Sequence, residues 1–394
     1  MKLKKGVVLI LACCFLSGCW DKVEIDRRSF ISTIAVDTGK DIGDEEKFKE
    51  IRSNEVFKEE DFKKLNVTFG FPDISELGPQ KGSTAKEQIV TTEAFSMQDS
   101  VTRLASKMSR SVYTGHSKLL ILSDQIMEYP ETVKEVFDFL ERQPDINRMM
   151  LVVIAKGKAE DFVNFQPSME KNIESYISGL MESGISNFNV LPTRMNDVLI
   201  SSYKNKNAII PTIEFDKVDK NKLIISGVAL IKDYKLDGYL TPSEDASLEI
   251  LRGKIKGGKE VILKEGHPIE LQITGIKRNI SLVDDANPQK LKFTIDVLLE
   301  GQLKGYYIDS DIFSEGEIEK IQDNFNDVIE RKCEKVARII QEQHTIDAIG
   351  LKEYVEKFRP GLYKRIKNNW EEVYKNANID VTVSTKARRL GITK

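Results

Sequence analysis

The chain has 394 residues, 31% of them charged, and its formal net charge at neutral pH is −3. A mildly acidic chain with well-mixed charges argues against nucleic acid as a partner. The length suffices for roughly two or three domains, each with its own packed core.

The first 18 residues have the composition of a secretory signal. Lys2, Lys4 and Lys5 form a basic head, and an apolar stretch of ten residues, 7–16, follows them. Such a stretch is too short to span a bilayer, which takes about 20 apolar residues. We therefore predict a signal peptide over residues 1–18 that is removed from the mature chain. No later apolar run is long enough to cross a membrane.

The leader ends in the sequence Leu-Ser-Gly-Cys at residues 16–19. This sequence resembles the lipobox of bacterial lipoproteins, in which the cysteine becomes the first residue and carries diacylglycerol. We expect a diacylglycerol thioether at Cys19, with or without an N-linked acyl chain such as palmitate. Two or three acyl chains anchor a protein stably, because each buried methylene contributes about 0.8 kcal/mol. The alternatives are an uncleaved N-terminal anchor and a disulfide at Cys19.

Cysteine usage favours lipidation over a disulfide. Cys13 and Cys14 leave with the leader and Cys19 is acylated, so Cys333 alone remains. Cys333 lies near the apolar stripe of a predicted helix, which favours a buried and inert thiol. The exported body must therefore be stabilised by its packed core.

The region 19–205 is predicted to be an N-terminal domain of mixed α/β structure, because strands and helices alternate in it. Ser96 and Asp99 form a capping box for one of its helices. The charged segment 41–64 is expected to be exposed. The predicted strands are 29–37, 65–71, 87–95, 117–122 and 149–155, and the predicted helices are 96–108, 126–140, 168–181 and 192–203.

From residue 206 the pattern changes to strands in close succession, which predicts a β-rich middle domain over 206–268. Thr241, Pro242 and Glu244 open a short helix within it. The strands predicted here and beyond are 208–215, 223–231, 234–240, 260–264, 269–283 and 290–303. The apolar residues of 269–283 do not stay at every second position, so they cannot all lie on one face of a regular strand. We therefore expect a bulge or bend near Gly275.

The longest predicted element is a helix at 314–344 in a C-terminal α/β domain, 269–394. Its apolar residues recur at three- and four-residue steps, and Ser314 and Glu317 form a capping box. A helix of this length extends roughly 46 Å, so it must lie across a sheet or bridge to another part. The expected fold is thus a three-domain mixed α/β (α+β) lipoprotein with sheets covered by helices.

The sequence contains no recognisable catalytic or metal-binding motif. Its histidines, His116, His267 and His344, lie far apart and lack the i, i+4 partner of a zinc helix. The run 253–260 matches a phosphate loop up to Lys259. It follows a predicted helix, leads into a strand and offers Glu260 where a hydroxyl is needed, so a basic Gly-rich turn is favoured. We expect no catalytic residue, no metal and no cofactor other than the lipid.

The segment "GCWDKVEIDRRSFISTIAVD" (18–37) resembles the opening of the Ger(x)C family, the lipoprotein C subunits of spore germinant receptors. Further similarity to this family lies at 113–126, 139–163, 226–254 and 346–391. The charged segment 41–64 departs from the family pattern and resembles an insertion. Ser226 is a second departure, since an apolar residue is usual there.

The resemblance implies a sporulation protein with three mixed α/β domains, held on the outer face of the spore inner membrane. It implies as partners a polytopic A subunit and a transporter-like B subunit of a nutrient receptor. The leading hypothesis is a non-enzymatic scaffold, with Gly115, His116, Trp370 and the long helix as possible interaction sites. The alternative is a solute-binding lipoprotein that captures the nutrient itself, although the sequence shows no duplicated half. An exported hydrolase is a third class, but no triad is visible.

Overall fold

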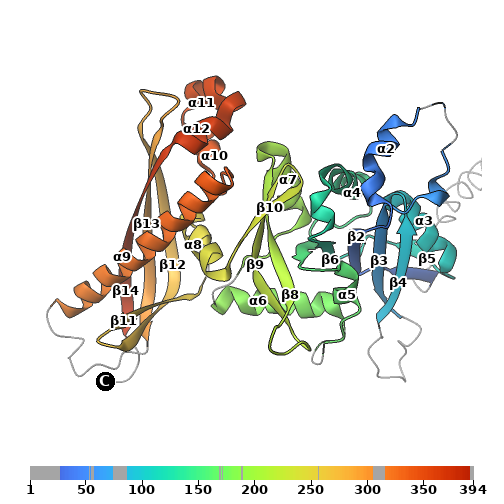
Figure 1. The fold of residues 1–394 in the computed structure, drawn as a ribbon. Coiled ribbons are helices and arrows are strands. Elements are labelled where there is room, and N and C mark those ends of the chain that lie inside the picture. Colours follow the sequence, from blue (N-terminus) through green and yellow to red (C-terminus); the bar gives the residue numbers. More distant parts are fainter. Residues whose placement is uncertain are drawn as a thin grey trace, which may run out of the picture.

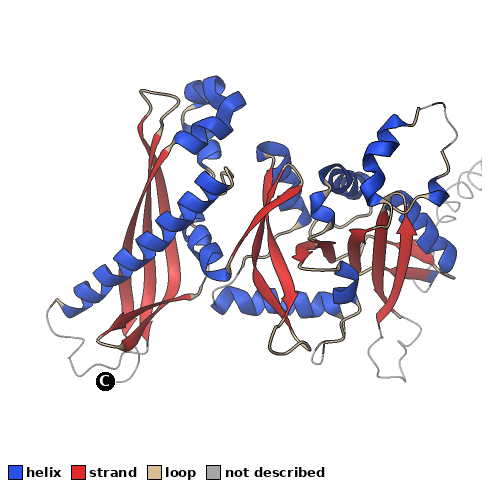
Figure 2. Ribbon diagram, in the orientation of Figure 1, coloured by secondary structure: helices blue, strands red, loops and turns tan. Residues whose placement is uncertain are grey.

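Two large β-sheets organise the described part of the chain (Figures 1 and 2). This computed structural model describes residues 27–52, 54, 57–73, 87–167, 170, 172–187, 190–255, 257–304 and 316–390. The predicted signal peptide 1–18, Cys19 and Trp20 lie outside these ranges. The combination of sheets and covering helices confirms the predicted mixed α/β class.

The larger sheet has eight strands in the order β10-β9-β8-β7-β6-β2-β3-β4. Strands β2, β6, β7 and β8 run parallel in its centre, and the outer pairs are antiparallel. The central strands β6 and β7 are buried throughout, as expected of parallel strands covered on both faces. The bounds are β2 (Thr33–Thr38), β3 (Leu65–Pro72), β4 (Glu87–Ala94), β6 (Leu119–Ser123), β7 (Leu151–Ala155), β8 (Asn207–Phe215), β9 (Leu223–Lys232) and β10 (Lys235–Leu240).

Helices pack on both faces of this sheet. Along β6, Leu120 and Leu122 join one apolar cluster while Leu119 and Ile121 join the other, because successive side chains of a strand point to opposite faces. The first cluster includes residues of α3 (Met97–Lys107), α4 (Pro130–Arg142) and α7 (Met195–Asn205). The second includes residues of α5 (Ala159–Val163) and α6 (Ile173–Asn187). A separate parallel pair joins β1 (Arg28–Phe30) to β5 (Ser111–Tyr113).

The second sheet has four strands in chain order, and a long helix lies across it (Figure 1). Its strands are β11 (Lys259–Lys264), β12 (His267–Asp284), β13 (Lys292–Lys304) and β14 (Asn378–Leu390). The helix α9 (Glu317–Arg338) continues into a π-helical turn, Ile339–Gln343. The predicted long helix is thereby confirmed over 317–343, with Gly316 at its N-cap, while Ser314 of the predicted capping box lies outside the described residues.

Several local predictions are confirmed by the structure. The hydroxyl of Ser96 accepts a hydrogen bond from the Asp99 backbone N–H at 3.2 Å, which caps α3. The expected bulge in β12 occurs as a register shift between Ile273 and Gly275. Three helices near the C-terminal end were not predicted: α10 (Leu351–Phe358), α11 (Pro360–Ile366) and α12 (Trp370–Asn376).

The eight-stranded sheet crosses the predicted boundary at 205/206. Strand β8 pairs with β7, with Thr212 opposite Ile154, so the strands after residue 206 extend the N-terminal sheet. The helix α8 (Pro242–Arg252) follows β10 and lies between the two sheets (Figure 1). The division into domains at 205/206 and 268/269 stays a prediction.

The segment 41–64 is attached to the body by aromatic contacts. The ring of Phe95 packs edge to face against those of Phe48 and Phe57, with centroids 5.4 and 4.9 Å apart. Its secondary structure consists of the 3-10 turns Ile42–Asp44 and Glu59–Asp61 and the helix α2 (Glu45–Glu50). Among the residues with described positions, no helix combines the length and the hydropathy needed to cross a membrane.

Candidate functional site

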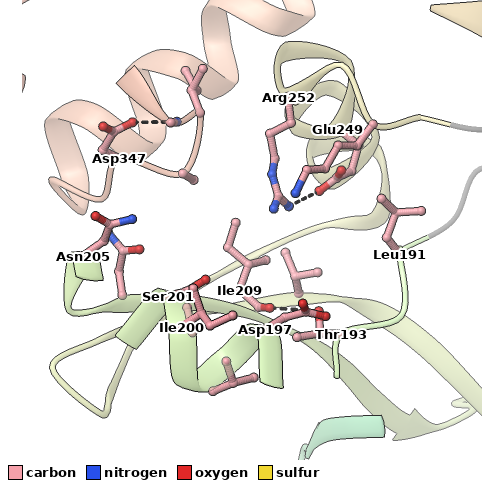
Figure 3. Close-up of a pocket in the computed structure, with 18 of the residues that line it drawn as sticks. Leu191, Thr193, Asp197, Ile200, Ser201, Asn205, Ile209, Glu249, Arg252 and Asp347 are labelled. Carbon is pink, nitrogen blue, oxygen red and sulfur yellow. Dashed lines mark hydrogen bonds and ion pairs between the residues drawn. The ribbon is translucent and has the colours of Figure 1, made fainter. Parts of the chain in front are cut away.

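A charged cavity of about 450 Å³ lies where the two sheets meet. Its walls come from α7 and β8 on the side of the eight-stranded sheet, and from α8, β12 and the segment 347–353 on the other side. Figure 3 shows Glu249 and Arg252 on α8 facing the segment of Asp347 across the cavity, with Asn205 and Ser201 of α7 along another wall.

Two carboxylates of α8 contribute to one wall. The helix begins at Pro242, and Thr241 and Glu244 form the predicted capping box. Asp245 and Glu249 are four residues apart, which places both on one face of the helix. They are only 1% and 4% exposed, and burial together with the charge of Glu249 raises the pKa of Asp245.

Hydrogen-bond donors do not satisfy all the oxygens of this carboxylate pair. Glu249 Oε1 accepts a hydrogen bond from Arg252 Nη1 within an ion pair. Asp245 Oδ1 and Glu249 Oε2 are buried and have no hydrogen-bond partner among the described residues. Buried polar atoms of folded proteins nearly always have such a partner, so these oxygens call for an explanation.

Asp347 holds the opposite wall in place. Its carboxylate is buried and accepts hydrogen bonds from the backbone N–H groups of Gly350, Leu351 and Lys352, at 3.0, 3.0 and 2.7 Å, at the start of α10. Burial, followed by the nearby charge of Glu353, raises the pKa of Asp347 to about 6. This carboxylate is therefore committed to capping the helix.

Polar contacts join the two walls beside the cavity. Asn205 Nδ2 donates a hydrogen bond to Glu353 Oε1, and Glu353 Oε2 has no partner among the described residues. The Lys352 ammonium group donates to the Lys204 carbonyl oxygen at 3.1 Å. Further along the junction, His344 Nδ1 lies 2.7 Å from Asp237 Oδ2. These contacts tie the end of α7 and β10 to the segment 344–353.

Three basic residues, Arg252, Lys254 and Arg278, also line the cavity. Arg278 Nη1 donates to the carbonyl oxygens of Leu251 and Ile349, at 3.0 and 3.1 Å, which ties β12 to α8 and to the segment before α10. Lys254 has no carboxylate within ion-pair distance in the described part of the chain. Desolvation by the surrounding cavity walls lowers the pKa of Lys254 and that of Arg278, and repulsion from Arg252 adds to both shifts.

The residues predicted as interaction sites lie away from this cavity. Gly115 is tightly packed, since a Cβ there would lie 2.5 Å from the Tyr113 hydroxyl oxygen. His116 is exposed next to it, and its ring meets that of Phe30 with centroids 6.1 Å apart. Trp370 is only 7% exposed, so little of its indole ring is available to a partner. The interaction roles of these residues stay predictions.

The described residues of the Gly-rich run 253–260 lead from a helix into a strand, as predicted. The run follows α8, Gly253 closes that helix in the left-handed conformation at φ 66°, and Lys259 opens β11. In the described ranges, no group of three His, Cys, Asp or Glu side chains is placed to hold a metal ion.

Sequence reasoning did not find the cavity residues. Charged residues make up 31% of the chain, so no single carboxylate is distinctive. One signal was available: Asp245 and Glu249 recur at helical spacing in a short helix, next to the apolar residues Leu248, Ile250 and Leu251. Their burial next to Arg252 depends on the second sheet, which the local sequence does not specify.

Comparison with known proteins identifies the class of this chain as a spore germination protein. Residues 21–215 match the family model described as "Spore germination protein N-terminal domain", and residues 226–391 match "Spore germination B3/ GerAC like, C-terminal". The chain belongs to the GerAC family of spore germination proteins. The predicted family resemblance is therefore confirmed.

Relatives and a solved structure resemble the chain over nearly its full length. Spore germination protein YndF of Bacillus subtilis (strain 168) is 24% identical over 100% of this chain and 99% of the relative. Spore germination protein B3 of the same organism is 24% identical over 97% and 96%, and GerQC of Bacillus cereus is 22% identical over 100% of both. The crystal structure of the GerBC protein covers 85% of this chain and 96% of its own, with 21% identity and a TM-score of 0.59, which shows the same fold.

Proposed function

We propose that this chain is the lipid-anchored, non-enzymatic C subunit of a spore germinant receptor and supports its assembly and its response to nutrients. The observation that carries the proposal is the match to both family models, in order, over residues 21–215 and 226–391. The lipobox at 16–19 supports the anchor. The partners are the A and B membrane subunits.

The anchor explains how such a subunit acts without catalysis. A thioether lipid at Cys19 confines the folded body to the outer face of the spore inner membrane. Confinement raises its effective concentration toward other membrane proteins, so that weak contacts suffice for assembly. The folded body then acts as a platform of fixed shape for the A and B subunits.

The test is to follow the tagged chain in spore membranes. The unmodified chain is expected in the membrane fraction, where it co-purifies with the A and B subunits. Cys19→Ala removes the acylated thiol, so the chain should leave this fraction and lose both partners. Cys14→Ala is the matched control, because it changes a leader cysteine outside the lipobox and should alter neither result. Retention of Cys19→Ala in the membrane with its partners would contradict the proposal.

A further inference from the structure

We propose that the cavity between the two sheets binds a small zwitterion, a molecule with both an ammonium and a carboxylate group, such as a free amino acid. The proposal concerns a ligand of this chain and goes beyond its role in assembly. It does not depend on the anchor at Cys19. It rests on the cavity, on unpaired oxygens in one wall and on unpaired N–H groups in another.

The carboxylates of α8 supply the site for the ammonium group. Asp245 and Glu249 are each more than nine-tenths buried and line the cavity, yet Asp245 Oδ1 and Glu249 Oε2 have no donor among the described residues. Arg252 bonds only one oxygen of Glu249. An ammonium group brings three N–H donors in a compact volume, which matches this deficit of donors, and its positive charge favours the ionised form of Asp245 that burial disfavours. Glu353 Oε2, in the facing wall, offers a further acceptor.

The basic residues supply the site for the carboxylate group. Arg278 uses only Nη1 for its two backbone hydrogen bonds, and the described residues give its other nitrogens no acceptor. Lys254, at the same wall, has no ion-pair partner there. A ligand carboxylate would accept charge-assisted hydrogen bonds from both side chains and offset their repulsion by Arg252.

The mixture of charges decides against ligands with only one charge. A metal cation at Asp245 and Glu249 would meet the positive charge of Arg252 and Lys254 nearby. An inorganic anion at Lys254 would meet the negative charge of Glu249. A volume of about 450 Å³ lies within the usual range for small-molecule pockets and leaves room for an amino-acid side chain against Ile209.

The binding test uses the full-length lipoprotein purified in detergent. Each of the common L-amino acids is titrated into the protein in a calorimeter, and at least one is expected to give saturable heat at one site per chain. Two derivatives of that amino acid are then titrated. The amide lacks the negative charge of the carboxylate, and the N-acetyl derivative lacks the positive charge of the ammonium group. Each derivative should bind at least about tenfold more weakly, the effect of losing one charge-assisted contact.

Variants locate the binding in the cavity. Lys254→Met should weaken binding at least about tenfold. It should keep the thermal melting curve, because Lys254 is exposed and has no ion-pair partner in the described structure. Glu249→Gln is a second variant, on the ammonium side. Lys375→Met, an exposed residue of α12 outside the cavity, is the control and should bind normally. The proposal is overturned if no amino acid gives saturable heat, or if Lys254→Met binds with unchanged affinity.

Discussion

The carboxylate of Asp37, at the end of β2, accepts hydrogen bonds from the backbone N–H groups of Ala159 and Glu160, at 2.7 and 2.9 Å. The side chain is buried, and burial raises its pKa although these hydrogen bonds oppose the shift. Ala159 opens α5, so a residue 122 positions earlier holds the start of this helix against the sheet. Asp37 and Ala159, which come from two segments that resemble the family, thereby meet in space.

Asp37→Ala is expected to lower the free energy of unfolding by about 2 kcal/mol, because it leaves one buried and one partly buried N–H group at a helix start without an acceptor. Asp37→Asn keeps one acceptor oxygen and should cost less. Urea denaturation followed by circular dichroism gives the measurement. Asp161→Ala, at an exposed position of α5, is the control with an expected effect below about 0.5 kcal/mol. Equal stabilities of Asp37→Ala and Asp161→Ala would show that the contact contributes nothing.

Gly227→Ala tests the close approach of the β9 and β10 backbones. Gly227 has a φ of 113°, and a Cβ there would lie 2.0 Å from the Leu240 carbonyl oxygen. Because the obstacle is backbone, the substitution should destabilise the protein by about 3 kcal/mol or more. Gly179→Ala is the matched control: it lies in α6 with open space around it and should stabilise by about 0.5 kcal/mol. The melting temperatures of both variants give the measurement, and an unchanged melting temperature for Gly227→Ala would contradict the expectation.

The pH dependence of stability follows from the buried carboxyl groups. In the folded protein the pKa of Asp347 is raised from 3.8 to about 6, and that of Asp245 is raised as well. The folded state therefore holds protons that the unfolded state releases, and stability falls as the pH rises from about 4 through 6 and toward neutrality. Urea midpoints measured across this range should show the decline. Rising stability over the same range would refute this assignment.

Asp245→Asn measures how much of the fall in stability with rising pH comes from Asp245. Asparagine imitates the protonated acid and cannot ionise, so the variant should lose part of the pH dependence. At pH 8 it should be more stable than the unmodified chain by on the order of 2 kcal/mol. Asp216→Asn, which changes a residue in the turn after β8, is a suitable control. A pH profile unaltered by Asp245→Asn would show that this carboxyl group titrates normally.

The thiol of Cys333 should not react with Ellman's reagent in the folded protein. Cys333 is completely buried in the apolar face of α9, and burial raises its pKa, so little thiolate forms and the reagent has no access. After denaturation of the mature lipoprotein, one thiol per chain is expected. A second, rapidly reacting thiol in the native sample would show that Cys19 is not acylated.

Local patterns predicted most of the elements of the larger sheet. The apolar run of β7 and the capping box at Thr241 and Glu244 depend on neighbours in the sequence, so they could be recognised there. The continuation of the sheet through β8 could not, because pairing between distant strands leaves no local pattern. Ser226 illustrates the same limit: its hydroxyl oxygen lies 3.0 Å from that of Thr212, which supplies a polar partner at a position where the resemblance led us to expect an apolar residue.

The cavity could not be predicted for a related reason. Asp245 and Glu249 are two of 62 acidic residues, and only the packing of α8 between the sheets makes them distinctive. The short helices α10, α11 and α12 were missed as well. Their apolar residues are too few to establish a helical period, and α10 begins where Asp347 caps it from outside the helix.

The enclosure of α8 has a mechanical consequence. Every residue from Asp245 to Leu251 is buried, and the helix contacts both β9 and α9. Interiors packed to this density resist changes in volume, so α8 fixes the spacing between the two sheets. The apolar residues of α8 thus join β9 and the four-stranded sheet into one continuous hydrophobic core.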